Sequence, residues 1–220
     1  MRPRSPIALA VALVLLVSAL WLGQGVLQRR TNVQAAQAPR FTVDPFWPKP
    51  LPNNWRLGSA IGVWVDDQDP PRQFRNPVHC ADRARDGLVY VCDRQANRIQ
   101  VFEADGTFVQ EAFFAPRSLR SGSTWDIAFS QDPAQRYLYL VDGVNEKVRV
   151  VLRETLEELT NFGAGGRQPG QFFGVHSIAT DSQGTIYTTE TYEGKRIQRF
   201  VNMGEGPVTV RDQGVPWPEP

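Results

Sequence analysis

The sequence predicts an all-β protein, a β-propeller built from repeated sheets, and three observations support this. A tyrosine-bearing strand that ends in an acidic residue recurs at spacings of 49 and 48 residues, at 90–93, 139–142 and 187–190. A second apolar run follows each copy, at 98–102, 148–152 and 196–200. A third short run precedes each copy. Self-similarity at this period, made of short strands and turns, is typical of propeller blades.

Three full blades are expected, at roughly 76–120, 121–172 and 173–204, within a propeller region over 61–210. The alternating run 61–66 resembles the first strand of one more blade, but no second and third strands follow it. Propellers typically have about four to eight blades, and stacked repeats need neighbours to bury their faces. We therefore expect a shortened ring that closes with four units, forms a homodimer or is unstable alone.

The segments that flank the blades are less regular. Residues 39–60 are rich in proline and aromatic residues, which favours an extended lead-in strand or arm because proline fixes φ and removes a donor. Residues 153–159 have a helix-like composition, but their place in the repeat predicts a loop and a strand. Segment 207–210 is expected as one more short strand, and 211–220 as a tail.

The N-terminus has the pattern of an export signal. Two arginines precede an apolar run from 7 to 23, and residues 33–35 offer a cleavage site. We assign 1–38 to a signal peptide, or to a signal anchor if the uncharged stretch 5–28 spans the bilayer. In both cases the chain is expected to be exported, to the periplasm or the outside of the cell.

Charge and cysteine content narrow the environment and the partners. A formal net charge of +1 argues against a nucleic-acid partner, which needs a basic face. Cys80 and Cys92 fall on adjacent strands of one predicted hairpin, and export places them in an oxidising compartment. A disulfide can form if their Cα atoms lie within about 7 Å. We favour the alternative, in which both are small buried apolar residues.

Several short segments carry a family resemblance. Segments 93–102 and 190–200 are similar to the end of the NHL-repeat consensus, with Asn-Arg-Ile-Gln-Val-Phe at 97–102 and Arg-Ile-Gln-Arg-Phe at 196–200. Segments 44–48 and 125–129 resemble exported bacterial NHL proteins that are similar to peptidyl-α-hydroxyglycine α-amidating lyase, a six-bladed propeller. The resemblance covers roughly residues 41–204. It implies an NHL-type propeller that is shortened relative to the six-bladed ring.

The resemblance also implies a metal site. In the lyase a zinc ion in the channel is held by histidines of different blades, and the enzyme releases glyoxylate from an α-hydroxyglycine peptide. Segment 173–179 is similar to one of its zinc-binding segments, which implies His176 as a ligand. His79 is the only other histidine, and Asp126 completes the one candidate set from three blades. The catalytic tyrosine and arginine of the family match no motif here.

Whether the two histidines share one position depends on how the blades are aligned. Counted back from Tyr90 and Tyr187, both lie 11 residues upstream and coincide. The blades can instead be aligned on an apolar residue followed by alanine, at 80–81, 127–128 and 178–179. In this alignment His79 is matched with Asp126 and Ser177. We favour the second alignment because it lies on the strand itself. It predicts that the two side chains point differently, since one residue flips the face of a strand, and that no ring of three ligands forms.

The repeated carboxylates are expected to be structural. Asp93, Asp142 and Glu190 each end a strand before a turn, where an acidic side chain accepts hydrogen bonds from backbone N–H groups. The repeated tyrosines are expected to pack in the sheets.

The most favoured function is a binding scaffold for a protein, peptide or small ligand on the propeller face or in the channel. The alternatives are a zinc-dependent, amidating-lyase-like enzyme and a non-functional truncated propeller.

Overall fold

The computed structural model describes residues 36–46, 74–75 and 77–217. The chain divides into two compact units, Met1–Ala36 and Gln37–Pro220, and every described strand lies in the second unit. Residues 1–35 of the predicted signal segment 1–38 and the predicted strand at 61–66 lie outside the described residues, whereas Gln37 and Ala38 of that segment begin a strand of the second unit. Among the described helices, none is long and apolar enough to cross a membrane.

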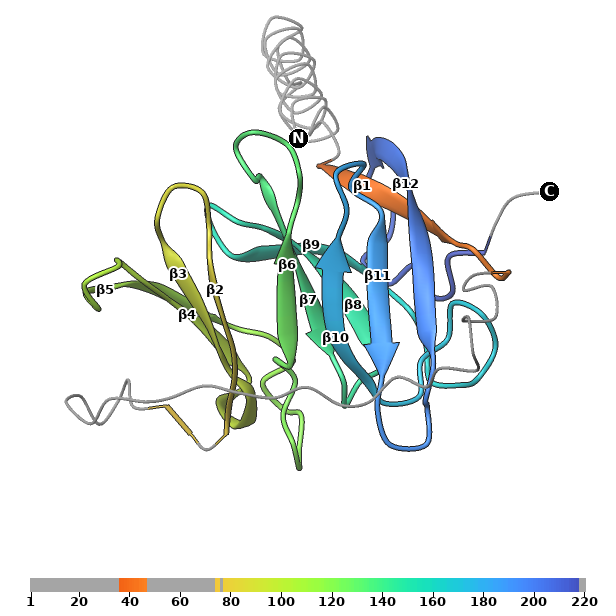
Figure 1. Cartoon of the computed structure of the whole chain (residues 1–220), viewed down its shortest axis with the longest axis horizontal. Coiled ribbons are helices and arrows are strands. Elements are labelled where there is room, and N and C mark those ends of the chain that lie inside the picture. The colour runs from red at the N-terminus through yellow and green to blue at the C-terminus, as the bar shows by residue number, and fades with distance from the viewer. Residues whose placement is uncertain (1–35, 47–73, 76, 218–220) are drawn as a thin grey trace, which may run out of the picture. The chain divides into compact units, whose positions relative to one another are not determined.

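Three separate four-stranded antiparallel sheets make up the described chain (Figure 1). Blade 1 contains β2 (Val78–Arg83), β3 (Val89–Asp93), β4 (Arg98–Phe102) and β5 (Phe108–Phe113). Blade 2 contains β6 (Asp126–Phe129), β7 (Tyr137–Asp142), β8 (Lys147–Leu152) and β9 (Glu157–Phe162). Blade 3 contains β10 (Val175–Thr180), β11 (Ile186–Glu190), β12 (Ile197–Pro207) and β1 (Gln37–Val43). The predicted all-β, three-bladed, partial propeller is confirmed. The prediction of a loop and a strand over 153–159, in place of a helix, is also confirmed, because β9 begins at Glu157.

The N-terminal strand completes the last blade. β1 pairs antiparallel with β12, with Gln37 opposite Pro207 and Val43 opposite Phe200. It therefore forms the outer strand of blade 3. The expected short strand at 207–210 is wrong, because β12 ends at Pro207 and its free edge is already taken by β1.

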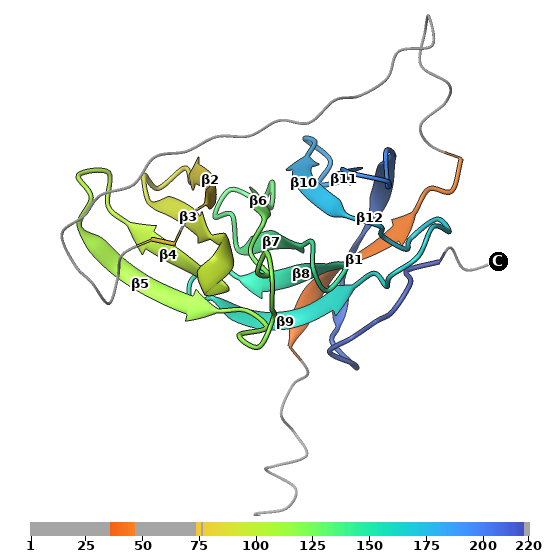
Figure 2. The same cartoon turned by 90° about the horizontal axis from the view of Figure 1, so that it is seen from below.

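Apolar side chains fill the two spaces between the blades. Seen from below, β2, β6 and β10 lie on one side of the three sheets, and β5, β9 and β1 lie on the other (Figure 2). Tyr90 of blade 1 and Tyr139 of blade 2 are each 1% exposed, within separate apolar clusters. Blade 2 contributes to both clusters, with Leu138 and Leu140 in the first and Val148 and Val150 in the second. Fully burying one such side chain stabilises the fold by about 1.5–3 kcal/mol.

Each blade pairs its repeated, buried carboxylate with an arginine in, or directly before, the next strand, which confirms the structural role of these carboxylates. The pairs are Asp93–Arg98 at 2.8 Å, Asp142–Arg149 at 2.5 Å and Glu190–Arg196 at 2.7 Å. The same carboxylates accept backbone hydrogen bonds from Arg75, Asn145 and Phe173, respectively. A buried carboxylate needs such partners because an isolated charge away from water is costly.

The two cysteines form a disulfide, so the expectation of two free apolar residues is wrong. Cys80 on β2 pairs directly with Cys92 on β3, and their Cα atoms are 4.9 Å apart. Residues directly opposite one another on antiparallel strands have Cα separations of about 4.5–5.5 Å, well inside the reach of a disulfide. The hairpin register therefore settles the question that the cysteine spacing left open.

Candidate functional site

The two histidines occupy the same structural position, in β-bulges at the start of β2 and β10. The register shifts between Val78 and Cys80 in blade 1 and between Val175 and Ser177 in blade 3. His79 and His176 are therefore the extra residues of their strands. In blade 2, Asp126 pairs with Val141 and so takes the position that Cys80 and Ser177 take in the other blades. Trp125, which precedes Asp126, therefore takes the position of the two histidines.

The prediction that the histidines point differently is wrong, and the register shows why. Ala81, one residue after Cys80, pairs with Val91. Ile178, one residue after Ser177, pairs with Thr188. Ala81 therefore matches Ile178 and not Ala179. The alignment on the apolar–alanine pair shifted blade 1 by one residue, whereas the alignment on the tyrosines was correct.

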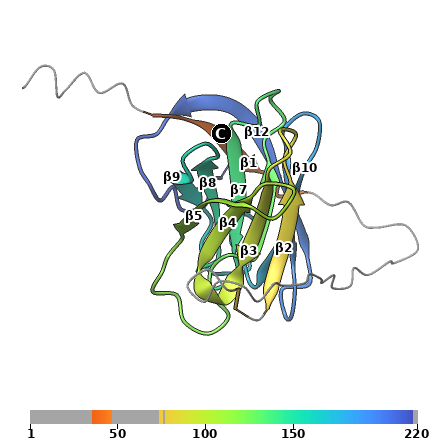
Figure 3. The same cartoon turned by 90° about the vertical axis from the view of Figure 1, so that its left-hand side faces the viewer.

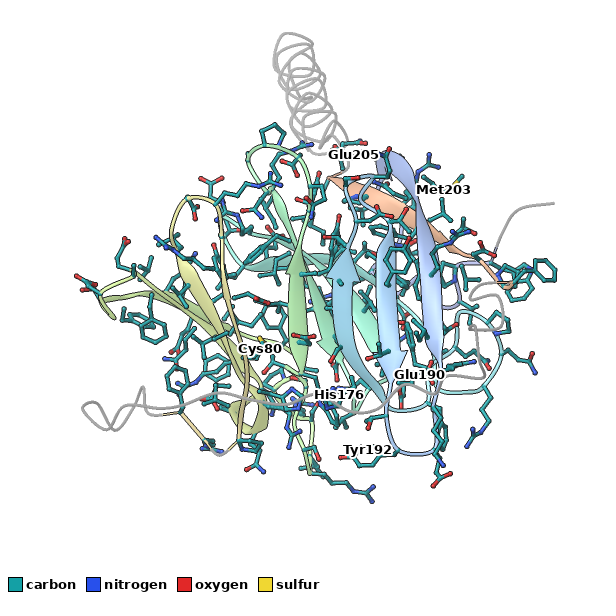
Figure 4. The ribbon with its side chains drawn as sticks, viewed as in Figure 1. Cys80, His176, Glu190, Tyr192, Met203 and Glu205 are labelled. Carbon is teal, nitrogen blue, oxygen red and sulfur yellow. A yellow bond between two sulfur atoms is a disulfide. The ribbon has the colours of Figure 1, made fainter. Side chains whose placement is uncertain are left out.

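His79, Trp125 and His176 come together as a cluster, which we call the triad. The ring centroids lie 4.7 Å apart for the two histidines, 5.4 Å for His79 and Trp125, and 5.3 Å for Trp125 and His176. The rings are tilted by 61°, 55° and 86°. The two contacts that His176 makes are edge-on, which is favourable aromatic geometry at these distances, and the contact between His79 and Trp125 is tilted. Trp125 is buried and both histidines are half-buried. His176 lies near the lower end of β10 in Figure 4.

Both histidines are neutral at neutral pH. Burial lowers the pKa of His79 to about 4, despite a 2.5 Å hydrogen bond from its ring Nδ1 to the carbonyl of Trp125. Burial and the nearby Arg94 guanidinium also lower the pKa of His176. A carbonyl can only accept, so Nδ1 of neutral His79 carries the proton and Nε2 keeps its lone pair.

Arg94 is a triad neighbour that sequence reasoning missed. It begins the short 3-10 helix η2 (Arg94–Ala96) and places its guanidinium carbon 4.8 Å from the centre of the Trp125 ring. This is a cation–π contact. Its Nε is buried and has no hydrogen-bond partner among the described residues. The only feature of the sequence that marks Arg94 is its position, directly after Asp93, the acidic residue that ends the tyrosine-bearing strand.

Asp126 does not join the triad. Its carboxylate accepts hydrogen bonds from the backbone N–H groups of Ile178 and Ile127, both at 3.0 Å, and so bridges blades 2 and 3. Within the described residues, no group of three or more His, Cys, Asp or Glu side chains is placed to hold a metal ion. Zinc takes three or four protein ligands or water. The two imidazoles brought together here are short of that number.

Exposed aromatic and cationic side chains flank the triad at the same ends of the strands. Tyr192 is 69% exposed and Phe173 is 41% exposed. The Arg167 guanidinium carbon lies 4.1 Å from the centre of the Phe173 ring, and Arg167 also donates to the carbonyl of Glu193 at 2.9 Å. Tyr192 and Lys195 have positive φ angles of 49°, a conformation that non-glycine residues rarely adopt. We call Arg167, Phe173, Tyr192 and Lys195 the rim.

No family model matches the chain. Among solved structures it is similar to Kuenenia stuttgartiensis hydrazine synthase, with 15% identity over 67% of this chain and 37% of that chain and a TM-score of 0.46. It is also similar to the Myceliophteria thermophila Cps50 (Swd1) β-propeller domain, with 12% identity, 60% and 37% coverage and a TM-score of 0.41. It is also similar to virginiamycin B lyase from Staphylococcus aureus, with 15% identity over 59% of this chain and 43% of that chain and a TM-score of 0.40. The chain spans less than half the length of each of these structures.

Proposed function

We propose that this chain is an exported binding scaffold that takes an anionic peptide or protein segment on the triad end of its blades. The observation that carries the proposal is the rim. Two exposed aromatic side chains and two exposed cations lie beside the triad, of which Trp125 is buried and the histidines are half-buried. One of these cations, Lys195, also lies 3.7 Å from the carboxylate of Glu193. Aromatic residues and arginine supply most of the binding energy in protein interfaces. Exposed cations attract an anionic partner and set its orientation.

The construction of the rim also supports binding. Glu146 accepts hydrogen bonds from the N–H groups of Gly174 and Val175, which ties the turn after β7 to the start of β10. Thr191 donates to the carbonyl of Gly174, which ties the loop after β11 to the same place. The rim residues therefore project from loops that are fixed to the sheets. A fixed surface loses less conformational entropy when a partner binds.

Export is the second part of the proposal, and the disulfide supports it. Disulfides persist in oxidising compartments such as the periplasm and the exterior of the cell, and both cysteines of this chain are bonded to each other. Sequencing the N-terminus of the protein isolated from its native cells would locate any cleavage. Recovery of the protein in the cytosol with two reactive thiols would contradict export.

Binding can be tested with an acidic probe of defined composition. A fluorescein-labelled, end-capped peptide of alternating glutamate and phenylalanine is titrated with the full chain, and its fluorescence anisotropy is followed. We expect Arg167→Gln and Tyr192→Ala each to raise Kd about three- to tenfold, which corresponds to about 0.6–1.4 kcal/mol. Added salt should weaken binding because it screens exposed charges.

Matched controls lie at the other end of the strands. Arg83 ends β2, and Met203 is 53% exposed at the opposite end from Tyr192 in Figure 4. Arg83→Gln and Met203→Ala should leave Kd unchanged. Equal weakening by rim and control substitutions, or no binding by the unsubstituted chain, would overturn the proposed function.

A zinc-dependent, lyase-like activity is the second candidate, and the histidine pair favours it. Two neutral imidazoles at 4.7 Å are ready to bind a metal without first losing a proton. The described residues supply only these two ligands, so no reaction step is assigned to them. Zinc content per chain, measured with and without His176→Ala, separates the candidates. Stoichiometric zinc that is lost in the variant would favour the enzyme, and a folded protein without zinc would favour the scaffold.

A further inference from the structure

We infer that a cleft between blades 2 and 3 binds a neutral, hydroxyl-rich small molecule, of the chemical class of sugars and other polyols. The cleft has a volume of about 340 Å³, and small-molecule sites in proteins measure about 300–1,000 Å³. It lies at the end of the blades opposite the triad. β12 arches over the top of the sheets in Figure 3, and Glu205 of β12, which lines the cleft, is labelled at that end in Figure 4. The inference is independent of the proposed ligand site.

Both blades supply polar side chains to the cleft. Blade 2 contributes residues 130–132 and two tyrosines of β7, Tyr137 and Tyr139. Blade 3 contributes the turn 182–184 and part of β12. Apart from Pro39 of β1 and two glycines, every lining residue has a polar side chain. This composition suits a ligand that forms many hydrogen bonds.

The hydroxyl of Tyr139 is the group that points to a ligand. The residue is only 1% exposed, yet its hydroxyl has no hydrogen-bond partner among the described residues. Burial, and after it the nearby charges of Asp132 and Glu205, raise the pKa of Tyr139. Both acids line the cleft, so the hydroxyl is the part of Tyr139 that faces it. Buried hydroxyl groups almost always have a partner, and a ligand in the cleft would supply one.

The repeated tyrosine is satisfied within the protein in the other two blades. The Tyr90 hydroxyl accepts a hydrogen bond from Nη1 of Arg153 at 3.0 Å. The Tyr187 hydroxyl donates to the carboxylate of Asp181 at 3.0 Å. Of the three repeated tyrosines, the one beside the cleft is therefore the one whose hydroxyl is left open.

The charged groups of the cleft are already paired with an arginine outside its lining. Arg136 donates to the carboxylate of Glu205, and its Nε lies 3.4 Å from the carboxylate of Asp132. Asp132 also accepts a hydrogen bond from the hydroxyl of Ser130 at 2.5 Å. Charge recognition is thus largely used up inside the protein.

The groups left open in the cleft are neutral. They are the hydroxyls of Tyr139 and Ser182 and the side-chain amide of Gln183, which make no hydrogen bond within the described part of the chain. A cationic ligand would have to compete with Arg136, and an anionic ligand would approach two carboxylates. An apolar ligand would leave the buried Tyr139 hydroxyl unpaired. Hydroxyl groups both donate and accept, so a polyol can pair with all three open groups.

The test uses three sugars that share one ring and differ in charge, namely neutral glucose, cationic glucosamine and anionic glucuronate. Each is titrated into the full chain, and Kd is measured by calorimetry. We expect glucose to bind most tightly and each charged sugar to have a Kd at least about threefold higher, because a charge must be desolvated without a free partner.

Variants locate the sugar. Tyr139→Phe removes only the hydroxyl and should raise the Kd of glucose about three- to tenfold. Its cooperative melt should stay, because the hydroxyl has no partner to lose within the described residues. Ser182→Trp, on an exposed turn, fills the cleft and should abolish binding. Tyr90→Phe, in blade 1, and Tyr192→Ala, at the rim, are the controls and should leave the Kd of glucose unchanged.

Each other outcome overturns the inference. If none of the three sugars binds, the cleft is not a sugar site. Tighter binding of glucosamine or glucuronate means that the site selects charge. An unchanged Kd in both Tyr139→Phe and Ser182→Trp places the sugar elsewhere, and weaker binding in Tyr192→Ala places it at the rim.

Discussion

At the scale of single residues, Asp126 shows how burial outweighs hydrogen bonding. Burial raises its pKa to about 6, although two backbone N–H groups favour the charged form. The folded state therefore holds the proton more tightly than the unfolded state, in which an aspartate pKa is about 3.9. The stabilising contribution is fully present below about pH 4 and is lost as the pH rises through about 6.

Asp126→Asn keeps an acceptor for Ile178 and removes the charge. We compare the free energy of unfolding of the variant with that of the unsubstituted chain at pH 4.5 and at pH 7.5. The difference in favour of the variant should be larger at pH 7.5 than at pH 4.5, by on the order of 2 kcal/mol. Urea unfolding at the two pH values measures this difference. Glu103→Gln, at an exposed turn, serves as the control. An identical pH dependence for Asp126→Asn and the unsubstituted chain would show that the raised pKa is wrong.

At the scale of secondary-structure elements, β1 is a structural part of blade 3 and not a loose arm. Phe41 is 7% exposed and lies 5.3 Å from Tyr139 and 5.6 Å from Phe162 between ring centres. We expect Phe41→Ala to lower the free energy of unfolding by about 3–5 kcal/mol, as measured by chemical denaturation. Arg40→Ala, at the adjacent exposed residue, should change it by less than about 0.5 kcal/mol. Equal effects of the two substitutions would mean that β1 is not folded against blade 2.

Strands that repeat could be predicted from the sequence, whereas pairings outside the repeat could not. The tyrosine-bearing strands indicated three blades because apolar and acidic residues recur in each. The bulges at His79 and His176 were missed because a bulge adds one residue without any compositional mark, and the alignment then slips by one. Arg94 was missed because its contact with Trp125 depends on the distance between two blades. No local pattern encodes that distance.

At the scale of the whole molecule, the three blades should unfold as one unit, because blade 2 shares an apolar cluster with each neighbour. The Cys80–Cys92 disulfide, with a sequence separation of 12, lies in blade 1. Closing a loop of this length stabilises a fold by about 3 kcal/mol. We therefore expect the double variant Cys80→Ala/Cys92→Ala to unfold in one transition with an unfolding free energy lowered by about that amount. Hydrogen exchange at buried amides of blade 3, such as that of Thr188, should quicken by about a hundredfold, since each 1.4 kcal/mol is a factor of ten. Two separate transitions, or unchanged exchange in blade 3, would show that blade 1 unfolds independently. A gradual, non-cooperative melt of the unsubstituted chain would favour a non-functional, truncated propeller.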